Sequence, residues 1–316
     1  MEGVHAVIRT EKKRSFLDRL GRDMRRYWRV YVMLLPVVAF YLVFKYGSMG
    51  YLVIAFQNFK PAKGILGSQW VGLDNFVKFF NNSYCWRLIR NTLLLNVFGI
   101  LFSFPAPILL ALMINEVQQK ALKKTIQTIS YIPHFISLVV VCGMLREFCS
   151  SGGLFNSMRA LLGLERYNLL TDPSLYRTIH IGSGIWQSVG WSSIIYLATL
   201  SGVDTQLYEA AYIDGANKFQ RILHVTLPAL VPIITVQFIM RIGHIMSLGY
   251  EKIILLYNST IYETADVIST YLYRYGLLGA KYGMGTAIGL MNSVINIIIL
   301  VSVNKAFSRL TENSLW

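Results

Sequence analysis

Charged residues are scarce in this chain of 316 residues: they make up 15% of it, against about one quarter in ordinary soluble domains. Acidic residues are scarcer than basic ones, with 16 Asp and Glu against 30 Lys and Arg. The three cysteines, Cys85, Cys142 and Cys149, are odd in number and lack metal-ligand spacing, which argues against a disulfide framework or a zinc site. Hydrophobic residues make up 54% of the chain, which indicates a membrane protein.

Several catalytic motifs are also missing. The sequence has no Gly-x-x-x-x-Gly-Lys-Ser/Thr phosphate-binding loop, so we expect any ATP to be bound by another chain. It has no Gly-x-Ser-x-Gly or His-Glu-x-x-His motif either, which leaves no basis for hydrolysis within the membrane. We therefore expect a protein that is not an enzyme and that binds no cofactor or metal itself.

Six apolar segments reach or approach the roughly 20 residues that a helix needs to cross a bilayer. The polar stretches between them are too short for a second folded domain. The sequence therefore predicts an all-α integral membrane domain over residues 30–316, with six transmembrane helices of which the fourth is the least apolar. The predicted helices run from Val30 to Phe56, Thr92 to Ile114, Ile126 to Met144, Thr178 to Leu200, Leu227 to Leu248 and Gly283 to Val303.

Residues 1–29 form a basic tail that holds nine of the thirty Lys and Arg residues. Arginines alternate there with Phe, Leu, Met, Tyr and Trp, which predicts an amphipathic helix with one apolar and one basic face. Such a helix suits anionic headgroups, a role as a topology-setting anchor, or the docking of a soluble partner. Basic residues favour the cytoplasmic side, so six spans place both termini in the cytoplasm of a bacterial cell.

The loop between the fourth and fifth predicted spans carries the most specific motif of the chain. Residues 208–228 contain Glu-Ala-Ala from Glu209, Asp-Gly-Ala from Asp214, an aromatic residue at Phe219 and Leu-Pro at the end. This segment resembles the EAA loop of the inner membrane components of binding-protein-dependent ABC importers. The resemblance implies the type I importer permease fold and a segment, about residues 205–228, that docks on an ATPase.

The physical character of the loop agrees with that role. Glu209 to Ile213 favour a helix, Gly215 permits a sharp turn or a close approach, and a second short apolar stripe follows. An amphipathic loop lying on the bilayer is the alternative, although Glu209 and Asp214 would suit anionic lipid poorly. The residues assigned to ATPase coupling are Glu209, Ala210, Ala211, Asp214, Gly215, Phe219, Ile222, Leu223, Leu227 and Pro228.

Two further stretches narrow the resemblance. Residues 56–76 and 262–271, together with Ser-Leu-Trp at 314–316, are similar to permeases for oligosaccharides and complex polysaccharides. The resemblance covers nearly the whole chain after the basic tail. It implies a second, homologous permease, two ATPase subunits that bind ATP and magnesium, and an extracellular or periplasmic solute-binding protein.

Polar residues within three of the predicted spans could line the path of a solute, because buried polar groups in a membrane need a cavity or each other. They recur three or four residues apart and so share one face of each helix. Their amide, charged and aromatic groups suit a sugar, but packing between helices is the alternative. The candidates are Ser183, Gln187, Trp191, Gln237, Arg241, His244, Asn292 and Asn296.

Three other functions remain open at this point. The first is a permease of the same class for a solute other than a sugar. The second is an ion-coupled secondary transporter, which would need a membrane carboxylate that the centres of the six spans lack. The third is a membrane enzyme acting on lipid-linked sugars, for which Glu251, Glu263 and Asp266 form the available outer acidic cluster.

Overall fold

The computed structural model describes residues 24–310, and the chain divides into two compact units, residues 1–53 and 54–316. Most of the predicted basic tail, residues 1–23, lies outside the described part. The first unit is a single helical run made of α2 (Trp28–Phe40), the π-helical η1 (Tyr41–Tyr46) and α3 (Gly47–Met49). The run continues through the 3-10 helix η2 (Gly50–Phe56), so neither Lys45 nor the glycines after it end the helix.

The second unit is helical apart from one two-stranded antiparallel ladder in which Gln57 pairs with Trp70. Its elements in chain order are β1 (Gln57–Asn58), η3 (Pro61–Lys63), α4 (Gly64–Gly67), β2 (Gln69–Trp70), α5 (Asp74–Phe80), α6 (Cys85–Phe98), η4 (Gly99–Ser103), α7 (Pro105–Asn115), α8 (Lys120–Tyr131), η5 (Ile132–Phe135), α9 (Leu138–Cys149), α10 (Leu154–Leu161), η6 (Leu169–Thr171), α11 (Pro173–Ser201), α12 (Thr205–Ile213), α13 (Lys218–Arg221), η7 (Ile222–Thr226), α14 (Leu227–Gly243), α15 (Glu251–Leu256), η8 (Ser259–Ile261), α16 (Tyr262–Ala265), α17 (Ile268–Tyr271), η9 (Leu272–Leu278) and α18 (Tyr282–Leu310).

Five helical runs of the described chain are long and apolar enough to cross a membrane: Trp28–Phe56, Cys85–Asn115, Leu138–Leu161, Lys218–Gly243 and Tyr282–Arg309. The 29 residues of α11 also suffice in length, but this helix is less apolar than those five. The all-α membrane fold is thus confirmed, whereas the sixth span rests on α11 and stays a prediction.

The third predicted span is wrong in its position. A continuous helix from Ile126 to Met144 was expected, but the chain leaves helical geometry at Ile136 and Ser137, whose ψ angles are 129° and 145°. Pro133 lies just before this break. The Ser137 hydroxyl then accepts a hydrogen bond from the Val140 N–H and so caps the new helix α9. The apolar run that could cross the membrane starts only at Leu138.

Helix α11 lies at the centre of the second unit, where it contacts α7, α8 and α14. It begins cleanly because Pro173 occupies its first turn and the Asp172 carboxylate accepts the Ser174 N–H at 2.8 Å. Gly190 lets it approach α8: a Cβ atom there would lie 2.0 Å from the Ser130 carbonyl oxygen. A buried apolar cluster that includes Ala111, Tyr196 and Leu230 joins α7, α11 and α14.

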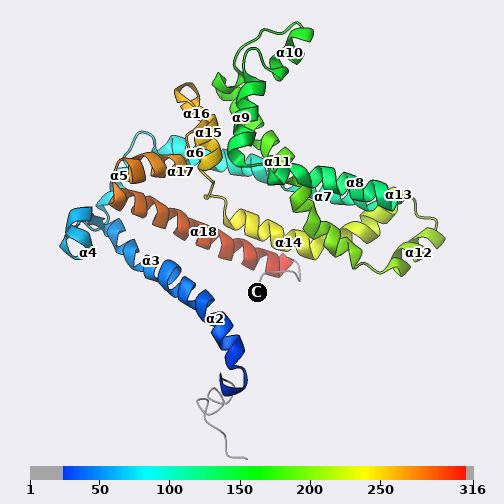
Figure 1. Ribbon diagram of the computed structural model, residues 1–316, viewed down its shortest axis with the longest axis horizontal. Helices are drawn as coiled ribbons and strands as arrows, with labels where there is room; N and C mark the ends of the chain where they lie inside the picture. The colour runs from blue at the N-terminus through cyan, green and yellow to red at the C-terminus, as the bar shows by residue number, and fades with distance from the viewer. Residues whose placement is uncertain (1–23, 311–316) are drawn as a thin grey trace, which may run out of the picture. The chain divides into compact units, whose positions relative to one another are not determined.

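Within the second unit, the segment α12–α13 and the segments α5 and α17 lie at opposite ends, at the right and left of Figure 1. Helices α14 and α18 contact each other, as does α11 with α7, and these helices run between the two ends (Figure 1). A cavity among them therefore lies between the predicted coupling segment and the opposite surface.

Candidate functional site

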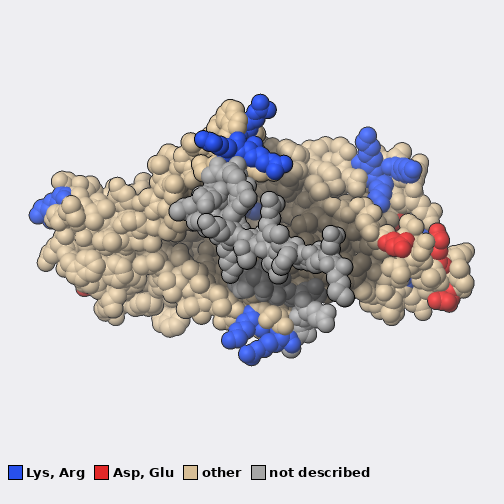
Figure 2. Space-filling model, turned by 90° about the horizontal axis from the view of Figure 1, so that it is seen from below, with Lys and Arg blue, Asp and Glu red and all other residues tan. Residues whose placement is uncertain are grey.

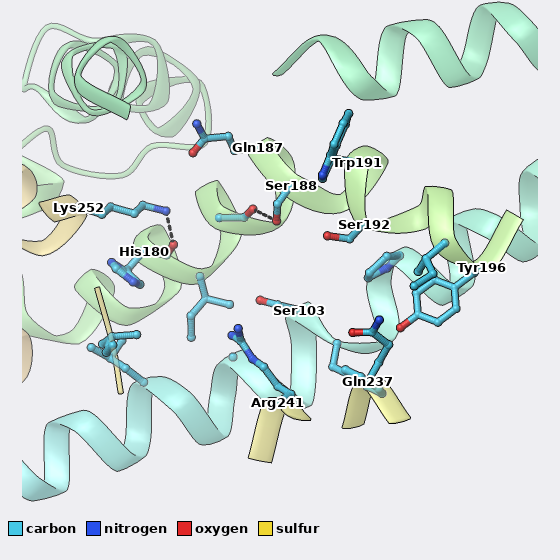
Figure 3. A pocket seen from close by; sticks show the side chains of 18 residues that line it. Ser103, His180, Gln187, Ser188, Trp191, Ser192, Tyr196, Gln237, Arg241 and Lys252 are labelled. Atoms are coloured by element: carbon cyan, nitrogen blue, oxygen red, sulfur yellow. Dashed lines mark hydrogen bonds between the residues drawn. The ribbon is translucent and has the colours of Figure 1, made fainter. Parts of the chain in front are cut away.

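A cavity of about 590 Å³ lies among α11, α14, α15, η4 and α7. Its volume falls within the range of small-molecule sites, about 300–1,000 Å³. The lining combines apolar residues with hydroxyl, amide, imidazole, indole and cationic groups. Its polar and aromatic members, labelled in Figure 3, are Ser103, His180, Gln187, Ser188, Trp191, Ser192, Tyr196, Gln237, Arg241 and Lys252. We call this space the solute cavity.

Helix periodicity explains how two helices supply most of these groups. Gln237 and Arg241 are four residues apart on α14 and share one of its faces. Ser188 and Ser192 are likewise four apart on α11. Figure 3 shows the two pairs on opposite sides of the solute cavity, with Arg241 and Gln237 rising from below. The cavity thus lies between faces of two helices, α11 and α14, that are far apart in the sequence.

Two cations enter the solute cavity without an acidic partner. Lys252 donates from Nζ to the His180 carbonyl oxygen at 2.8 Å. Arg241 forms no ion pair with any residue between 24 and 310, and its guanidinium lies beside Gly99 of η4. No Asp or Glu belongs to the lining. The cavity therefore carries a net positive charge that an anionic group could neutralise.

Lys252 lies on α15, outside the membrane-spanning runs. Burial lowers its pKa to about 8, because the charged ammonium loses water, and the nearby Cys142 thiol offsets this only in part. Half-buried Lys252 is therefore a cation whose charge changes close to physiological pH.

Trp191 of the cavity lining belongs to an aromatic cluster beside the break between η5 and α9. The Trp191 indole stacks on the His134 imidazole, with ring centroids 4.6 Å apart and planes 3° apart, and Phe135 meets the same indole edge-on. Gln187 donates from Nε2 to the Ile136 carbonyl oxygen at 3.1 Å. The broken helix thus supplies the rings that pack on Trp191 and the carbonyl group that accepts from Gln187, and so holds two residues of the cavity lining in place.

The predicted coupling segment is a helix-turn-helix. Helix α12 ends at Ile213, and Gly215 turns the chain with a φ of 74°. Asn217 then starts α13 with a capping box in which it exchanges hydrogen bonds with Gln220 at 2.8 and 2.9 Å. The Tyr208 hydroxyl lies 3.1 Å from that of Thr226, which joins the two arms. The local geometry therefore matches the prediction.

This segment leaves large apolar side chains uncovered: Tyr212, Ile213 and Phe219 are each at least 72% exposed. Glu209 and Asp214 are exposed too, and within the described chain neither forms an ion pair. Figure 2 shows acidic side chains gathered at the right-hand end of the molecule, where Figure 1 has α12. Such a patch is typical of a surface that a protein partner covers.

Comparisons with known proteins match this chain to membrane components of transport systems, and the matches together span nearly its whole length. Residues 103–311 match the family described as binding-protein-dependent transport system inner membrane component. The chain belongs to this family. It is 39% identical over 315 residues to the polygalacturonan/rhamnogalacturonan transport system permease protein of Bacillus subtilis (strain 168), covering 99% of this chain and 97% of that protein. An arabinooligosaccharides transport system permease protein of the same organism is 29% identical over 267 residues, covering 84% of this chain and 82% of that protein.

Solved structures support the same assignment. A chain of a bacterial alginate ABC transporter, in complex with an alginate pentasaccharide-bound periplasmic protein, superimposes with a TM-score of 0.86 at 45% identity, covering 94% of this chain and all of that one. A second crystal structure shows a bacterial ABC transporter involved in the import of the acidic polysaccharide alginate. One of its chains superimposes with a TM-score of 0.85 at 46% identity, covering 93% of this chain and 99% of that one. The protein is thus a multi-pass inner membrane permease of sugar or polysaccharide ABC importers. The comparisons give no support to an ion-coupled transporter or a permease for another solute.

Four of the predicted path residues of this permease line the solute cavity: Gln187, Trp191, Gln237 and Arg241. The other four lie elsewhere. Ser183 lines a separate apolar cavity among α9, α10 and α11. The exposed His244 bonds through Nδ1 to the Met240 carbonyl oxygen at 2.9 Å.

Asn292 and Asn296 lie on α18, outside the lining of the solute cavity. Asn296 accepts the Met246 N–H at 3.1 Å and donates to the Ser247 hydroxyl at 2.8 Å, so it ties the chain after α14 to α18. The buried Oδ1 of Asn292 has no hydrogen-bond partner in the described chain. The contacts of Asn296 favour the packing interpretation for this residue.

Sequence reasoning missed several lining residues, of which Lys252 matters most. It lies in a segment that the sequence predicts to be an outer loop, because α15 is too short and too charged to resemble a span. His180 and Tyr196 were missed because they do not continue the i, i+4 series of Ser183, Gln187 and Trp191. One feature of the sequence could have indicated that Lys252 lies in a buried site: it directly precedes a run of five apolar residues, 253–257.

Proposed function

We propose that this permease translocates oligosaccharides that carry carboxylate groups, and that these pass through the solute cavity. The observation that carries the proposal is the pair of cations, Arg241 and Lys252, in a lining without Asp or Glu. Arginine binds carboxylates through paired charge-assisted hydrogen bonds. Trp191 adds an aromatic face and Gln237 an amide for sugar hydroxyls. The relatives support the same chemistry: one belongs to a polygalacturonan/rhamnogalacturonan transport system, and another is involved in the import of the acidic polysaccharide alginate.

Uptake by the complete importer in proteoliposomes tests this proposal. Labelled trigalacturonate and its neutral counterpart, a trisaccharide of galactose, should be compared at equal concentration with ATP inside. We expect trigalacturonate to enter and the neutral trisaccharide to compete poorly against it. Equal uptake of both, or uptake of the neutral sugar alone, would contradict the assignment of the solute class.

The pH dependence of uptake should report the charge of Lys252. As pH rises through about 8, this lysine loses its proton, so that about one in ten remains charged at pH 9. The substrate carboxylates stay ionised over this range, so their attraction to the site weakens as pH increases. We expect the KM for trigalacturonate to increase between pH 7 and pH 9. In Lys252→Arg the charge persists, and the same increase in that variant would exclude Lys252 as its source.

The α12–α13 segment is proposed to dock on an ATPase subunit and to transmit its closure to α14. Support comes from the exposed apolar side chains Tyr212, Ile213 and Phe219 and from the direct continuation of α13 through η7 into α14. Burial of each large apolar side chain would stabilise the contact by roughly 1.5 to 3 kcal/mol. ATP and magnesium then belong to two ATPase subunits. A second homologous permease and an extracellular or periplasmic binding protein complete the proposed importer.

We also propose six spans, with α11 as the fourth and both termini in the cytoplasm. An alkaline phosphatase fusion after Asn217 should then be inactive, because the enzyme requires the outer compartment. The matched fusion after Asn258, between the fifth and sixth spans, should be active. Activity of the Asn217 fusion would overturn both the topology and the placement of the coupling segment.

A further inference from the structure

A second polar cavity, of about 650 Å³, is lined by elements at the end of the second unit opposite α12–α13. Its walls come from the start of α6, the segment from η8 to η9, and the approach to α18, and it shares no lining residue with the solute cavity. Four tyrosines line it, so we call it the tyrosine cavity. Under the proposed topology it opens to the outside, where solute arrives.

The floor of the tyrosine cavity is a fixed ionic cluster. Asp266 is only 1% exposed, and Arg274 donates from Nη2 to both of its carboxylate oxygens at 2.8 Å. The Thr270 hydroxyl donates to the same carboxylate at 2.7 Å. Arg87 is the second cation, with Nη2 3.6 Å from Asp266, and its buried Nε has no hydrogen-bond partner in the described chain. One carboxylate thus balances one of two arginines.

Lys281 adds a third cation to the lining, and it is exposed. No acidic residue other than Asp266 belongs to the cavity wall. With Arg87, Arg274 and Lys281 against one carboxylate, the cavity has two positive charges in excess. An anionic ligand would restore the balance without displacing the Arg274–Asp266 pair.

Two tyrosine rings remain open beside these cations. Tyr84 and Tyr275 are 43% and 38% exposed. Arg87 lies over the Tyr84 ring at 4.7 Å from its centroid, and Lys281 lies 5.8 Å from that of Tyr275. Tyr275 is held in place by stacking on Tyr271, with centroids 4.4 Å apart. Each of these two partly exposed tyrosine rings therefore has a cation next to it.

We propose that the tyrosine cavity is a second carbohydrate site, which binds one or more uronate residues before they reach the solute cavity. The C–H face of a sugar ring packs on Tyr275 or Tyr84, while its carboxylate pairs with Lys281 or Arg87. A concave site of this volume, with aromatic walls and a few polar groups, fits a small ligand better than a flat protein contact. The solute class rests on the proposed function.

The test uses the purified importer in nanodiscs without its binding protein, with trigalacturonate as the probe and calorimetry as the readout. The variant Arg241→Met serves as background, because it disables the solute cavity and leaves the tyrosine cavity intact. We expect this background to bind trigalacturonate more tightly than the neutral galactose trisaccharide. Adding Lys281→Gln and Tyr275→Ala should weaken trigalacturonate binding about tenfold or more.

Matched controls are Lys63→Gln and Tyr250→Ala, which alter an exposed lysine and an exposed tyrosine outside the cavity wall and should leave binding unchanged. Lys281→Arg with Tyr275→Phe should retain binding, which separates loss of the ligand contacts from misfolding. Trigalacturonate binding that survives Lys281→Gln with Tyr275→Ala would overturn the inference. A separate pull-down with the binding protein added checks the alternative: if Lys281→Gln with Tyr275→Ala loses only its association with the binding protein and keeps trigalacturonate binding, the cavity is a protein contact and the inference is wrong.

These outcomes are distinguishable from failure of the proposed function. If the tyrosine cavity binds trigalacturonate selectively but uptake does not discriminate against the neutral sugar, the inference stands and the role of the solute cavity is wrong. If uptake is selective but the Arg241→Met background binds no trigalacturonate, the tyrosine cavity is not a carbohydrate site.

Discussion

Gly215→Val is expected to abolish solute-stimulated ATP hydrolysis in the reconstituted importer while the chain still inserts into the membrane. Gly215 has a φ of 74°, a conformation that costs an L-residue about 1–2 kcal/mol, and a β-branched side chain tolerates it poorly. Apart from Gly215 and its two chain neighbours, no residue of the described chain comes within 4 Å of the position where a Cβ would be. The damage therefore comes from the turn itself and from any partner surface that approaches it.

Gly215→Asn is the matched control, because asparagine adopts the left-handed conformation more readily than valine does. If backbone strain is the cause, Asn should retain much of the stimulation, whereas a close partner contact would make both variants fail. Glu209→Lys tests the same surface through charge. ATP hydrolysis and co-purification of the ATPase are the measurements. Normal values for both Gly215→Val and Glu209→Lys would show that α12–α13 does not couple.

The helix-turn-helix of α12–α13 could be predicted from the sequence because its geometry is local. The helix of Glu209 to Ile213, the turn at Gly215 and the start of the next helix at Asn217 each depend on residues within one or two turns of the chain. The positive φ of Gly215 and the exposure of Phe219 are the expected consequences. The hydrogen bond between the Tyr208 and Thr226 hydroxyls could not be predicted in this way, because the two residues lie 18 positions apart in the sequence.

The solute cavity could be predicted only in part because it depends on contacts between distant segments. Periodicity correctly placed Gln237 and Arg241 on one face of α14, but it could not indicate that Lys252 of α15 reaches the same space. The break at Ile136 and Ser137 was missed because the predicted span was extended across Pro133, the local signal that a helix ends nearby. Apolar content measures whether a segment tolerates lipid, and it carries no information on where a helix stops.

Arg241→Met is expected to lower uptake of trigalacturonate at subsaturating concentration by about tenfold to a hundredfold. Loss of a hydrogen bond to a charged group costs about 1.5–3 kcal/mol, and each 1.4 kcal/mol corresponds to a factor of ten. Assembly should survive, because Arg241 forms no ion pair with the described residues and is exposed to the cavity. Methionine keeps the length of the side chain and removes its charge.

The accompanying variants separate recognition from structure. Arg241→Lys keeps the charge but loses the paired donors, so its uptake should lie between those of the wild type and Arg241→Met. Arg146→Met removes an exposed arginine of α9 that lines neither the solute cavity nor the tyrosine cavity, and it should transport normally. Co-purification of the ATPase and the second permease reports assembly. If Arg241→Met fails to assemble, Arg241 holds the helices together and the packing interpretation is correct. If Arg241→Met assembles and transports trigalacturonate at the normal rate, the carboxylate is recognised elsewhere.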